Sequence, residues 1–330
     1  MWWFLLSVSL VVAVSAGLLL GAVSIGPGDL WRVFLDKVGI SDGGGTQAES
    51  VLWAIRIPRV LAATLVGAAL AVAGAALQGV YRNPLADPYL LGISSAAGLG
   101  VILGIALTPA GAFPVLVALG GAAAGAGYAL LTRRISAATV DPARFVLVGV
   151  ALGLALLAWT GIVVFRWDSP RLPTLTYWIF GSFVGVTWRT LVAATPFVLV
   201  ALATMAFFTR SLDLLALGDR EARLLGIGVD RIVTLILAAV GVAVGATVGL
   251  AGVIGFIGLL VPFVLRRAVG PANRQLFLAS AIGGAAVMVG ADVLARTLAS
   301  PAEIPVGIIT ASVGGPFLVW LLMRHGRAPT

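Results

Sequence analysis

Cysteine is absent from this 330-residue sequence, and histidine and lysine occur once each, as His325 and Lys37. These absences exclude a disulfide framework, a Cys/His zinc cluster and an interior Ser-His-Asp triad. A P-loop needs lysine followed by serine or threonine, whereas Lys37 is followed by Val38. We therefore expect the chain to contain no catalytic residue, no metal site and no bound cofactor, and not to be an ATPase itself.

Charge is also scarce. Charged residues make up 10% of the sequence and hydrophobic residues 60%, whereas a soluble domain carries about 25% charged residues. One membrane-spanning helix needs about 20 apolar residues, so the 60% share, about 198 residues, supplies about ten spans. The composition predicts an all-α polytopic membrane protein, with residues 1–330 forming a single transmembrane domain.

The expected spans lie in charge-poor stretches: 1–28, 60–81, 89–132, 145–165, 190–209, 232–265, 275–291 and 304–323. Thr108-Pro109 and Phe113-Pro114 divide the stretch 89–132, and the glycine-rich run Gly249–Gly258 divides 232–265, which gives ten spans. The first stretch is longer than a signal peptide's apolar core of about 7–15 residues, so we expect a retained helix. Small residues at four-residue spacing predict close helix packing: Gly67, Ala71, Ala75 and Gly79, and Gly241, Gly245 and Gly249.

The net charge of +8 is explained by membrane topology rather than by nucleic acid. Ten spans place both termini on one side, and the positive-inside rule makes that side cytoplasmic. Of the 21 lysine and arginine residues, 13 then lie inside. The other eight lie outside: Arg32, Lys37, Arg56, Arg59, Arg166, Arg171, Arg189 and Arg296.

Four groups of segments are too specific for generic lipid-facing helix. They are Arg56–Arg59 with Leu77–Pro88 and Leu91–Ser94; Tyr177–Ser182; Leu217–Gly226; and Gly255–Pro262 with Asp292, Arg296, Glu303–Thr310 and Gly315–Phe317. In this order and spacing, from about residue 50 to about residue 325, they resemble the permease subunits of ABC importers for iron-siderophores, haem and cobalamin, the FecCD family.

The resemblance implies a type II ABC importer permease fold, multi-pass in the bacterial inner membrane, with both termini cytoplasmic. It implies a homodimer with a second permease copy, two ATP-binding cassette subunits inside, and a periplasmic or surface substrate-binding protein outside. ATP and Mg would be bound by the partner ATPase, in agreement with the missing P-loop. The implied cargo is a bulky metal chelate moved by ATP-driven alternating access: haem or a ferric siderophore, ahead of cobalamin.

The segment 213–231 carries seven charged residues among leucines, which predicts a short amphipathic helix at the cytoplasmic membrane surface. Asp219 is placed to cap this helix and Gly226 to end it. From the residues alone, a helix resting on lipid headgroups is the alternative. The resemblance implies the coupling helix that docks into the ATPase, made of Asp219, Arg220, Glu221, Ala222, Arg223, Leu224, Leu225 and Gly226.

On the outer side, Arg56 and Arg59 lie three residues apart at a helix start, so their side chains are neighbours. Arg296 lies four residues after Asp292. The residues alone are compatible with snorkelling at a span end and a local Asp292–Arg296 ion pair. The resemblance implies that Arg56, Arg59 and Arg296 meet acidic residues of the binding protein.

Pro84 prevents regular helix at the cytoplasmic end of the second span and so predicts a shaped loop. The resemblance implies that Asn83 and Leu85 in this loop form part of a cytoplasmic gate, with a second gate segment at Pro142 and Ala143. Cobalamin permeases have small hydroxyl residues at the two positions of Pro142 and Ala143, so this chain departs from the family pattern there. In a second departure, Phe263 stands where many relatives have histidine, and we expect it to pack.

The resemblance places the translocation path on the fifth and tenth spans, where Trp159, Thr160 and Thr310 are among the few polar-capable side chains. An apolar lining suits a bulky chelate, because a tight site would hold the cargo. Without cysteine or membrane histidine the path offers iron no soft or imidazole ligand, so iron must arrive chelated. The alternative, an ion-gradient-driven secondary transporter, usually has ionisable residues at mid-membrane.

Overall fold

The structure is a computed structural model that describes residues 1–21, 25–37, 47–107, 114–137, 142–166, 179–300 and 302–325. Throughout these ranges the regular secondary structure is helical. The long elements are α1 (Trp2–Leu19), α4 (Ile57–Tyr81), α5 (Ile93–Leu107), α6 (Pro114–Ala137), α7 (Pro142–Phe165), α9 (Trp188–Phe207), α12 (Val229–Ala251), α13 (Ile257–Val269), α14 (Asn273–Thr297) and α15 (Val306–His325).

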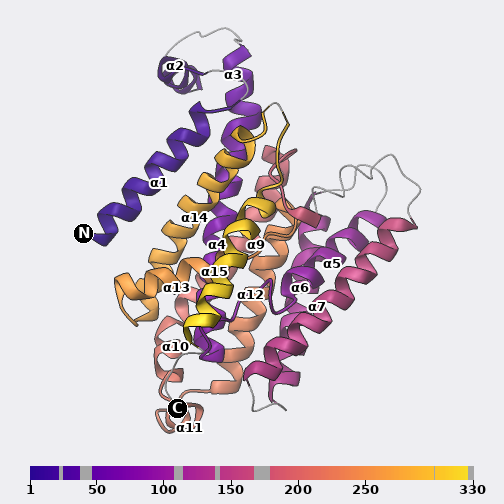
Figure 1. Cartoon of the computed structure of the whole chain (residues 1–330), viewed down its shortest axis with the longest axis vertical. Helices are drawn as coiled ribbons and strands as arrows, with labels where there is room; N and C mark the ends of the chain where they lie inside the picture. The colour runs from indigo at the N-terminus through magenta and orange to yellow at the C-terminus, as the bar shows by residue number, and fades with distance from the viewer. Residues whose placement is uncertain are drawn as a thin grey trace.

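Short helices lie at the two ends of this bundle (Figure 1). α2 (Pro27–Lys37), α3 (Gln47–Val51) and the π-helical η1 (Leu52–Arg56) lie at the upper end, and α10 (Thr209–Leu215) and α11 (Asp219–Leu224) at the lower end. α1 runs toward the upper end and α15 runs away from it. Both directions are those that the predicted topology requires.

Eight helices in the described part of the chain are long and apolar enough to cross a membrane. α5 has 15 residues and α13 has 13. At about 1.5 Å per residue they reach roughly 22 and 20 Å, less than the roughly 30 Å of a hydrocarbon core. α5 ends just before the predicted break at Thr108-Pro109, and α13 follows the predicted break in the run Gly249–Gly258. The all-helical multi-span architecture and the break before α13 are confirmed, whereas Thr108, Pro109 and Phe113 of the other predicted break lie outside the described residues.

Each short helix follows a non-helical segment: 82–92, which is partly buried, precedes α5, and 252–256, which is mostly buried, precedes α13. Within the first, the Asp87 carboxylate accepts the N–H groups of Tyr89 at 2.9 Å and Leu90 at 3.2 Å. The Pro88 carbonyl accepts the N–H of Ile93 at 3.0 Å. Non-helical backbone inside a membrane protein must find hydrogen-bond partners for its N–H and C=O groups within the protein, and these contacts supply some of them.

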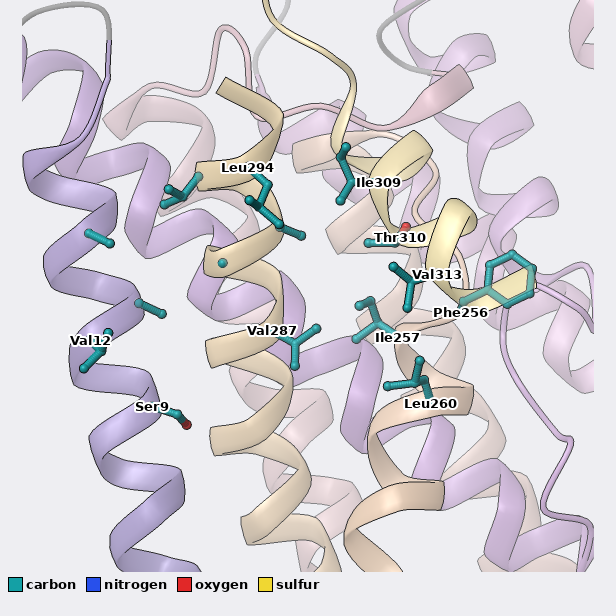
Figure 2. Close-up of a pocket in the computed structure, with 15 residues that line it drawn as sticks. Ser9, Val12, Phe256, Ile257, Leu260, Val287, Leu294, Ile309, Thr310 and Val313 are labelled. Carbon is teal, nitrogen blue, oxygen red and sulfur yellow. The ribbon is translucent and has the colours of Figure 1, made fainter. Parts of the chain in front are cut away.

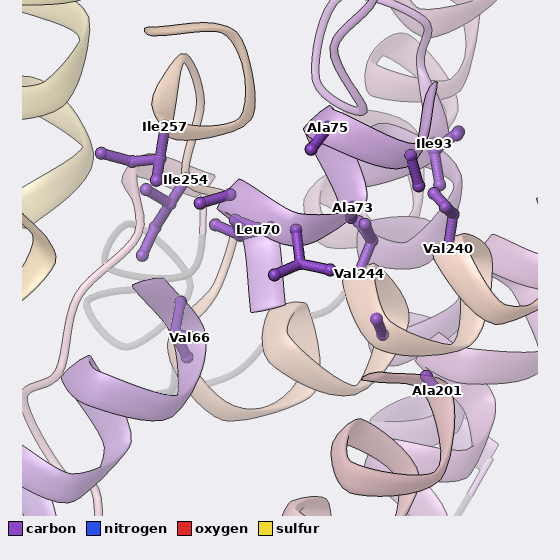
Figure 3. Packing of buried hydrophobic residues seen from close by; sticks show 14 of the residues in the cluster. Val66, Leu70, Ala73, Ala75, Ile93, Ala201, Val240, Val244, Ile254 and Ile257 are labelled. Atoms are coloured by element: carbon purple, nitrogen blue, oxygen red, sulfur yellow. The ribbon is translucent and has the colours of Figure 1, made fainter. Parts of the chain in front are cut away.

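Helix contacts through small residues hold the bundle together. Gly245 of α12 lies against the Gly121 carbonyl of α6, and Gly67 of α4 lies against the Gly284 carbonyl of α14, with no space for a Cβ atom at either contact. Backbones that approach this closely gain dispersion contacts that lipid does not favour. The close packing predicted from the small-residue spacing is confirmed. Figure 3 shows the buried aliphatic side chains around these contacts, with Val66 and Leu70 from α4 and Val240 and Val244 from α12.

A buried amide connects α4 to α13. Pro262, inside α13, lacks the N–H that would bond the Gly258 carbonyl one turn earlier. Gln78 of α4 supplies a donor instead, because its Nε2 lies 3.3 Å from the Gly258 oxygen and 3.4 Å from the Leu259 oxygen. The proline in α13 is thus matched by a glutamine on its neighbour.

Candidate functional site

The segment predicted to couple to an ATPase forms α11, at the lower end of the bundle (Figure 1). Gly218 occupies the N-cap position, and Asp219 is the first helical residue. The prediction that Asp219 caps the helix is wrong: its carboxylate accepts a hydrogen bond from Nη2 of Arg82 at 2.7 Å. The Asp219 side chain is therefore used between two elements rather than within α11.

Gly226 ends α11, as predicted. Its φ is +82°, a left-handed conformation that suits glycine, and its N–H donates to the Arg223 carbonyl at 3.0 Å. The next N–H, that of Ile227, donates to the Ala222 carbonyl at 3.0 Å. These two bonds form a Schellman motif, which satisfies the last carbonyls of the helix.

Exposed leucines lie on α11 and directly before and after it. Ala222 is fully buried, whereas Leu217, Leu224 and Leu225 are 62%, 80% and 59% exposed. The charged residues Arg220, Glu221 and Arg223 are exposed as well. Leucines this exposed, next to charged residues, form a surface suited to a protein partner or to lipid headgroups.

The C-terminal end of α11 is connected to α6 and α12 through Asp230, in the first turn of α12. Nη2 of Arg133, from α6, lies 2.9 Å from the Asp230 carboxylate, and Nη2 of Arg223, from α11, lies 3.3 Å from it. Arg133 also donates to the hydroxyl of Thr234. α11 is thus bound to neighbouring elements at both of its ends.

The predicted gate loop follows α4 directly. Its Asn83 side-chain oxygen accepts the N–H of Leu85 at 2.9 Å, and the Asn83 carbonyl accepts the N–H of Ala86 at 3.1 Å. The expected shaped loop is therefore present. Pro142 and Ala143 are the first two residues of α7, and their side chains lie outside the described part of the structure.

Two of the three outer arginines, Arg59 and Arg296, form a network with the carboxylates of Asp292 and Glu303. Arg59 binds Asp292 through Nε at 3.0 Å and Nη2 at 2.8 Å, and its Nη1 donates to Glu303 at 2.8 Å. Nε of Arg296 lies 3.3 Å from the other Asp292 oxygen, so the ion pair expected from the sequence is formed. The network joins α4, α14 and the segment before α15.

Arg56 and Arg296 bind the C-terminal turn of α1. Nη1 of Arg56 donates to the carbonyls of Leu18 at 2.7 Å and Leu19 at 2.8 Å, and Nη2 of Arg296 donates to that of Gly17 at 3.0 Å. The final carbonyls of a helix lack helical donors and carry partial negative charge, so cations stabilise them.

Arg56, Arg59 and Arg296 are only 3%, 6% and 8% exposed. The structure brings the three together but directs their guanidinium groups to partners within the chain, and their predicted contact with a binding protein stays a prediction. The contact between Arg59 and Asp292 was not predicted from the sequence. A buried aspartate in an apolar helix was the available signal, because such a group needs a cationic partner.

The predicted path residues do not line one cavity. Thr160 lies in a cavity of about 190 Å³, whereas Thr310 lies in an apolar groove of about 580 Å³ bounded by α1, α13, α14 and α15. Figure 2 shows this groove, with Thr310 and Val313 of α15 near Val287 of α14, and Val12 on α1 at its far side. Trp159 is 60% exposed on α7.

Two aromatic residues that were not predicted as site residues line the cavity that contains Thr160. Tyr89 and Phe180 line the 190 Å³ cavity and also a neighbouring cavity of about 400 Å³, together with Ile179 and Val253. Phe180 belongs to the specific segment Tyr177–Ser182, of which Tyr177 and Trp178 lie outside the described residues. That segment was the signal available in the sequence.

The profile of the FecCD transport family matches residues 9–324. The chain belongs to the FecCD transport family. It is 37% identical over 332 residues to the hemin transport system permease protein HmuU of Yersinia pestis, covering 98% of this chain and 95% of that protein. It is also 37% identical over 337 residues to the vitamin B12 import system permease protein BtuC of Escherichia coli O157:H7, covering 99% and 96%.

A solved structure supports the same assignment. A transporter described as being of the metal-chelate ABC type, in an inward-facing conformation, superposes with a TM-score of 0.81 at 28% identity, over 97% of this chain and 98% of that one. This FecCD protein has the type II ABC importer permease fold and is a multi-pass inner-membrane permease subunit. ATP is bound by its partner ATPase. The gradient-driven alternative is therefore set aside.

One departure from the family also has a structural account. The Phe263 ring packs edge-to-face on Phe317, with ring centroids 5.6 Å apart, and the Arg267 guanidinium lies 4.9 Å from the Phe263 ring centroid. Phe263 is thus a packing residue in this FecCD permease, as expected.

Proposed function

We propose that this permease works as a homodimer that carries a bulky metal chelate inward by ATP-driven alternating access. The observation that carries the proposal is the lining of the two cavities around Tyr89 and Phe180. Their described lining residues include the hydroxyls of Ser95, Thr160 and Ser312 but no charged side chain. Such a lining is suited to contact with a large, chelated cargo, and it supplies no strong ligand for a bare metal ion.

The proposed cargo is haem or a ferric siderophore, ahead of cobalamin. HmuU is named for hemin and BtuC for vitamin B12, and both are equally similar to this chain. The two names support a metal chelate as the class of cargo. Trp159, Thr160 and Thr310 are proposed to face the path in the course of transport.

A second copy of the chain is proposed to cover α7 and α15, the fifth and tenth spans. In the single chain only 17% of the α7 span and 22% of the α15 span are buried, against 78% of the span that contains α4. Exposure on these two helices supports an interface between copies; the α1 span is less buried still, at 6%, and lipid is the alternative cover for all three.

The residues Asp219 to Gly226 are proposed to dock into the ATPase, one on each permease copy. Support comes from the exposed leucines of α11 and from its connections at both ends. Asn83 and Leu85 are proposed to act in the cytoplasmic gate, together with Pro142 and Ala143.

The outer surface around Arg56, Arg59 and Arg296 is proposed to receive the binding protein. The three arginines are bound to partners inside the chain. For Arg59 to contact an acidic residue of the binding protein, that residue must replace one of the carboxylates that Arg59 binds within the chain. Glu303 is the half-buried carboxylate of the network and so the one best placed to leave. Complementary charge sets encounter rate and register more than affinity, so association should weaken with salt.

The test is a complex of permease, ATPase and binding protein reconstituted in liposomes. ATP hydrolysis and uptake are measured with the binding protein loaded in turn with haem, a ferric siderophore and cobalamin. We expect one of the first two to stimulate hydrolysis most, with uptake abolished by vanadate and unaffected by an uncoupler. Strongest stimulation by cobalamin would overturn the proposed cargo. Uptake that ignores vanadate would overturn the ATP-driven mechanism.

A further inference from the structure

We infer that Arg82 is a positioning residue that passes movement of α11 to the gate loop through its ion pair with Asp219. The inference rests on the proposed roles of α11 and of the loop 82–85. Nη2 of Arg82 lies 2.7 Å from Oδ1 of Asp219, although 137 residues separate the two in the sequence. Arg82 directly precedes Asn83, so a pull on its side chain acts at the start of the gate loop.

The backbone of Arg82 indicates that its side chain is needed. Arg82 ends α4 in the left-handed region, with φ 48° and ψ 33°. This conformation is unfavourable for a residue with a Cβ atom, and helix ends that adopt it usually carry glycine. An arginine in this conformation makes the fold less stable than a glycine would. We therefore infer that the guanidinium group of Arg82 has a role other than stabilising the helix end.

Asp219 shows the same pattern. It stands at the start of α11, where an aspartate commonly caps the helix, yet no side-chain capping bond is made and its carboxylate binds Arg82. The side chains of Arg82 and Asp219 are 45% and 52% exposed. Ion pairs this exposed add little to folding stability, so a contribution to stability does not explain the pair.

The surroundings leave room for movement. A cavity of about 630 Å³ is lined by Arg82, Asn83 and Pro84 on one side and by Asp213 and Ala216 of the α10 region on the other. The gate loop and this region are therefore not closely packed across the cavity. Beside this cavity, the ion pair between Arg82 and Asp219 connects the gate loop to α11.

The other end of α11 is bound through Arg223 and Asp230 to Arg133 of α6. A displacement of α11 by the ATPase would therefore act on α6 and α12 at one end and on α4 and its loop at the other. Loss of the Arg82 contact would leave α11 docked and attached to α12, with its connection to the gate loop removed.

The test compares Arg82→Gly and Asp219→Asn with the double variant in the reconstituted complex. Thermal stability, copurification of the ATPase, ATP hydrolysis and chelate transported per ATP are measured. Arg82→Gly should keep or raise the melting temperature and should retain the ATPase, while chelate transported per ATP falls about fivefold or more. Arg82→Lys, which keeps the charge, should restore much of this ratio.

The double variant should transport as much chelate per ATP as either single variant, because all three lack the same contact. An unchanged ratio in Arg82→Gly, or losses in the two single variants that multiply in the double, would overturn the inference. Loss of the ATPase from Arg82→Gly would also overturn it, because Arg82 would then act in docking. A wild-type complex without ATP-driven uptake would instead contradict the proposed function.

Discussion

The side-chain amide of Gln78 donates to the carbonyl oxygen of Gly258, the acceptor that Pro262 leaves without its helical donor. The bond lies in the buried interior, where Gln78 is 4% exposed. A buried carbonyl without a partner costs about 1–3 kcal/mol. The glutamine thus allows a proline inside a short helix of the bundle.

Replacement of Gln78 by leucine should lower the free energy of unfolding by about 1–3 kcal/mol, because the Gly258 carbonyl loses its donor. The measurement is thermal unfolding in detergent. Pro262→Ala restores a backbone N–H in α13, so the double variant should recover part of the loss. Strictly additive losses in the double variant would show that the two residues do not share this carbonyl.

Asp292→Asn should be severely destabilising. The carboxylate is 1% exposed and is bound by Arg59 and Arg296, so its loss leaves two buried cations undercompensated. Breaking a buried ion pair from one side costs about 3–5 kcal/mol. Glu303→Gln is the matched control, because Glu303 is 34% exposed, and it should cost less than about 1 kcal/mol. Equal melting temperatures for the two variants would contradict the assignment of Asp292 as the centre of the network.

Leu224→Asp tests the docking surface of α11. Leu224 is 80% exposed and makes little contribution to the core, so the melting temperature of the free permease should change by no more than the equivalent of about 0.5 kcal/mol. Copurification of the ATPase should be lost, because a charge enters the apolar surface. Gln275→Asp adds the same charge at an exposed position of α14 and should retain the ATPase. Retention by both variants would favour a helix that rests on lipid.

Two glycine-to-alanine changes should have opposite effects. A Cβ at Gly245 would enter the backbone of α6 near Gly121, so Gly245→Ala forces α6 and α12 apart and should cost about 1–3 kcal/mol. Gly290 of α14 has open space where its Cβ would lie, so Gly290→Ala should be neutral or stabilise by up to about 1 kcal/mol. Thermal unfolding of both proteins in the same detergent is the measurement. A Gly245→Ala protein as stable as wild type would mean that the close approach is not needed.

Composition and helix-breaking residues were sufficient to predict the bundle. Apolar stretches located the helices, proline marked the boundary after α5, and the glycine-rich run Gly249–Gly258 located the break before α13. The reduced lengths of α5 and α13 were not predicted, because buried non-helical segments such as 252–256 are as apolar as the helices they precede. The hydropathy of a segment indicates whether it is buried or in lipid, but it does not indicate whether its backbone is helical.

The site was predicted in part. α11 and its end at Gly226 could be recognised locally, since a Schellman motif depends on a few adjacent residues. The partner of Asp219 could not, because Arg82 lies 137 residues away and an aspartate at a helix start has a local role that fits equally well. For Thr160 and Thr310, the nearly uniform apolar sequences of α7 and α15 do not indicate which face meets a cavity.

The anchoring of α1 has a consequence for biosynthesis. Arg56, which binds the last turn of α1, is made soon after that helix, but Arg296, which binds the Gly17 carbonyl, lies 279 residues after Gly17. Asp292, the carboxylate that neutralises Arg59, is made at the same late stage. Until α14 has been made, Arg59 at the outer end of α4 therefore lacks the carboxylate that neutralises it. α1 therefore obtains its full set of contacts only after α14 has been made.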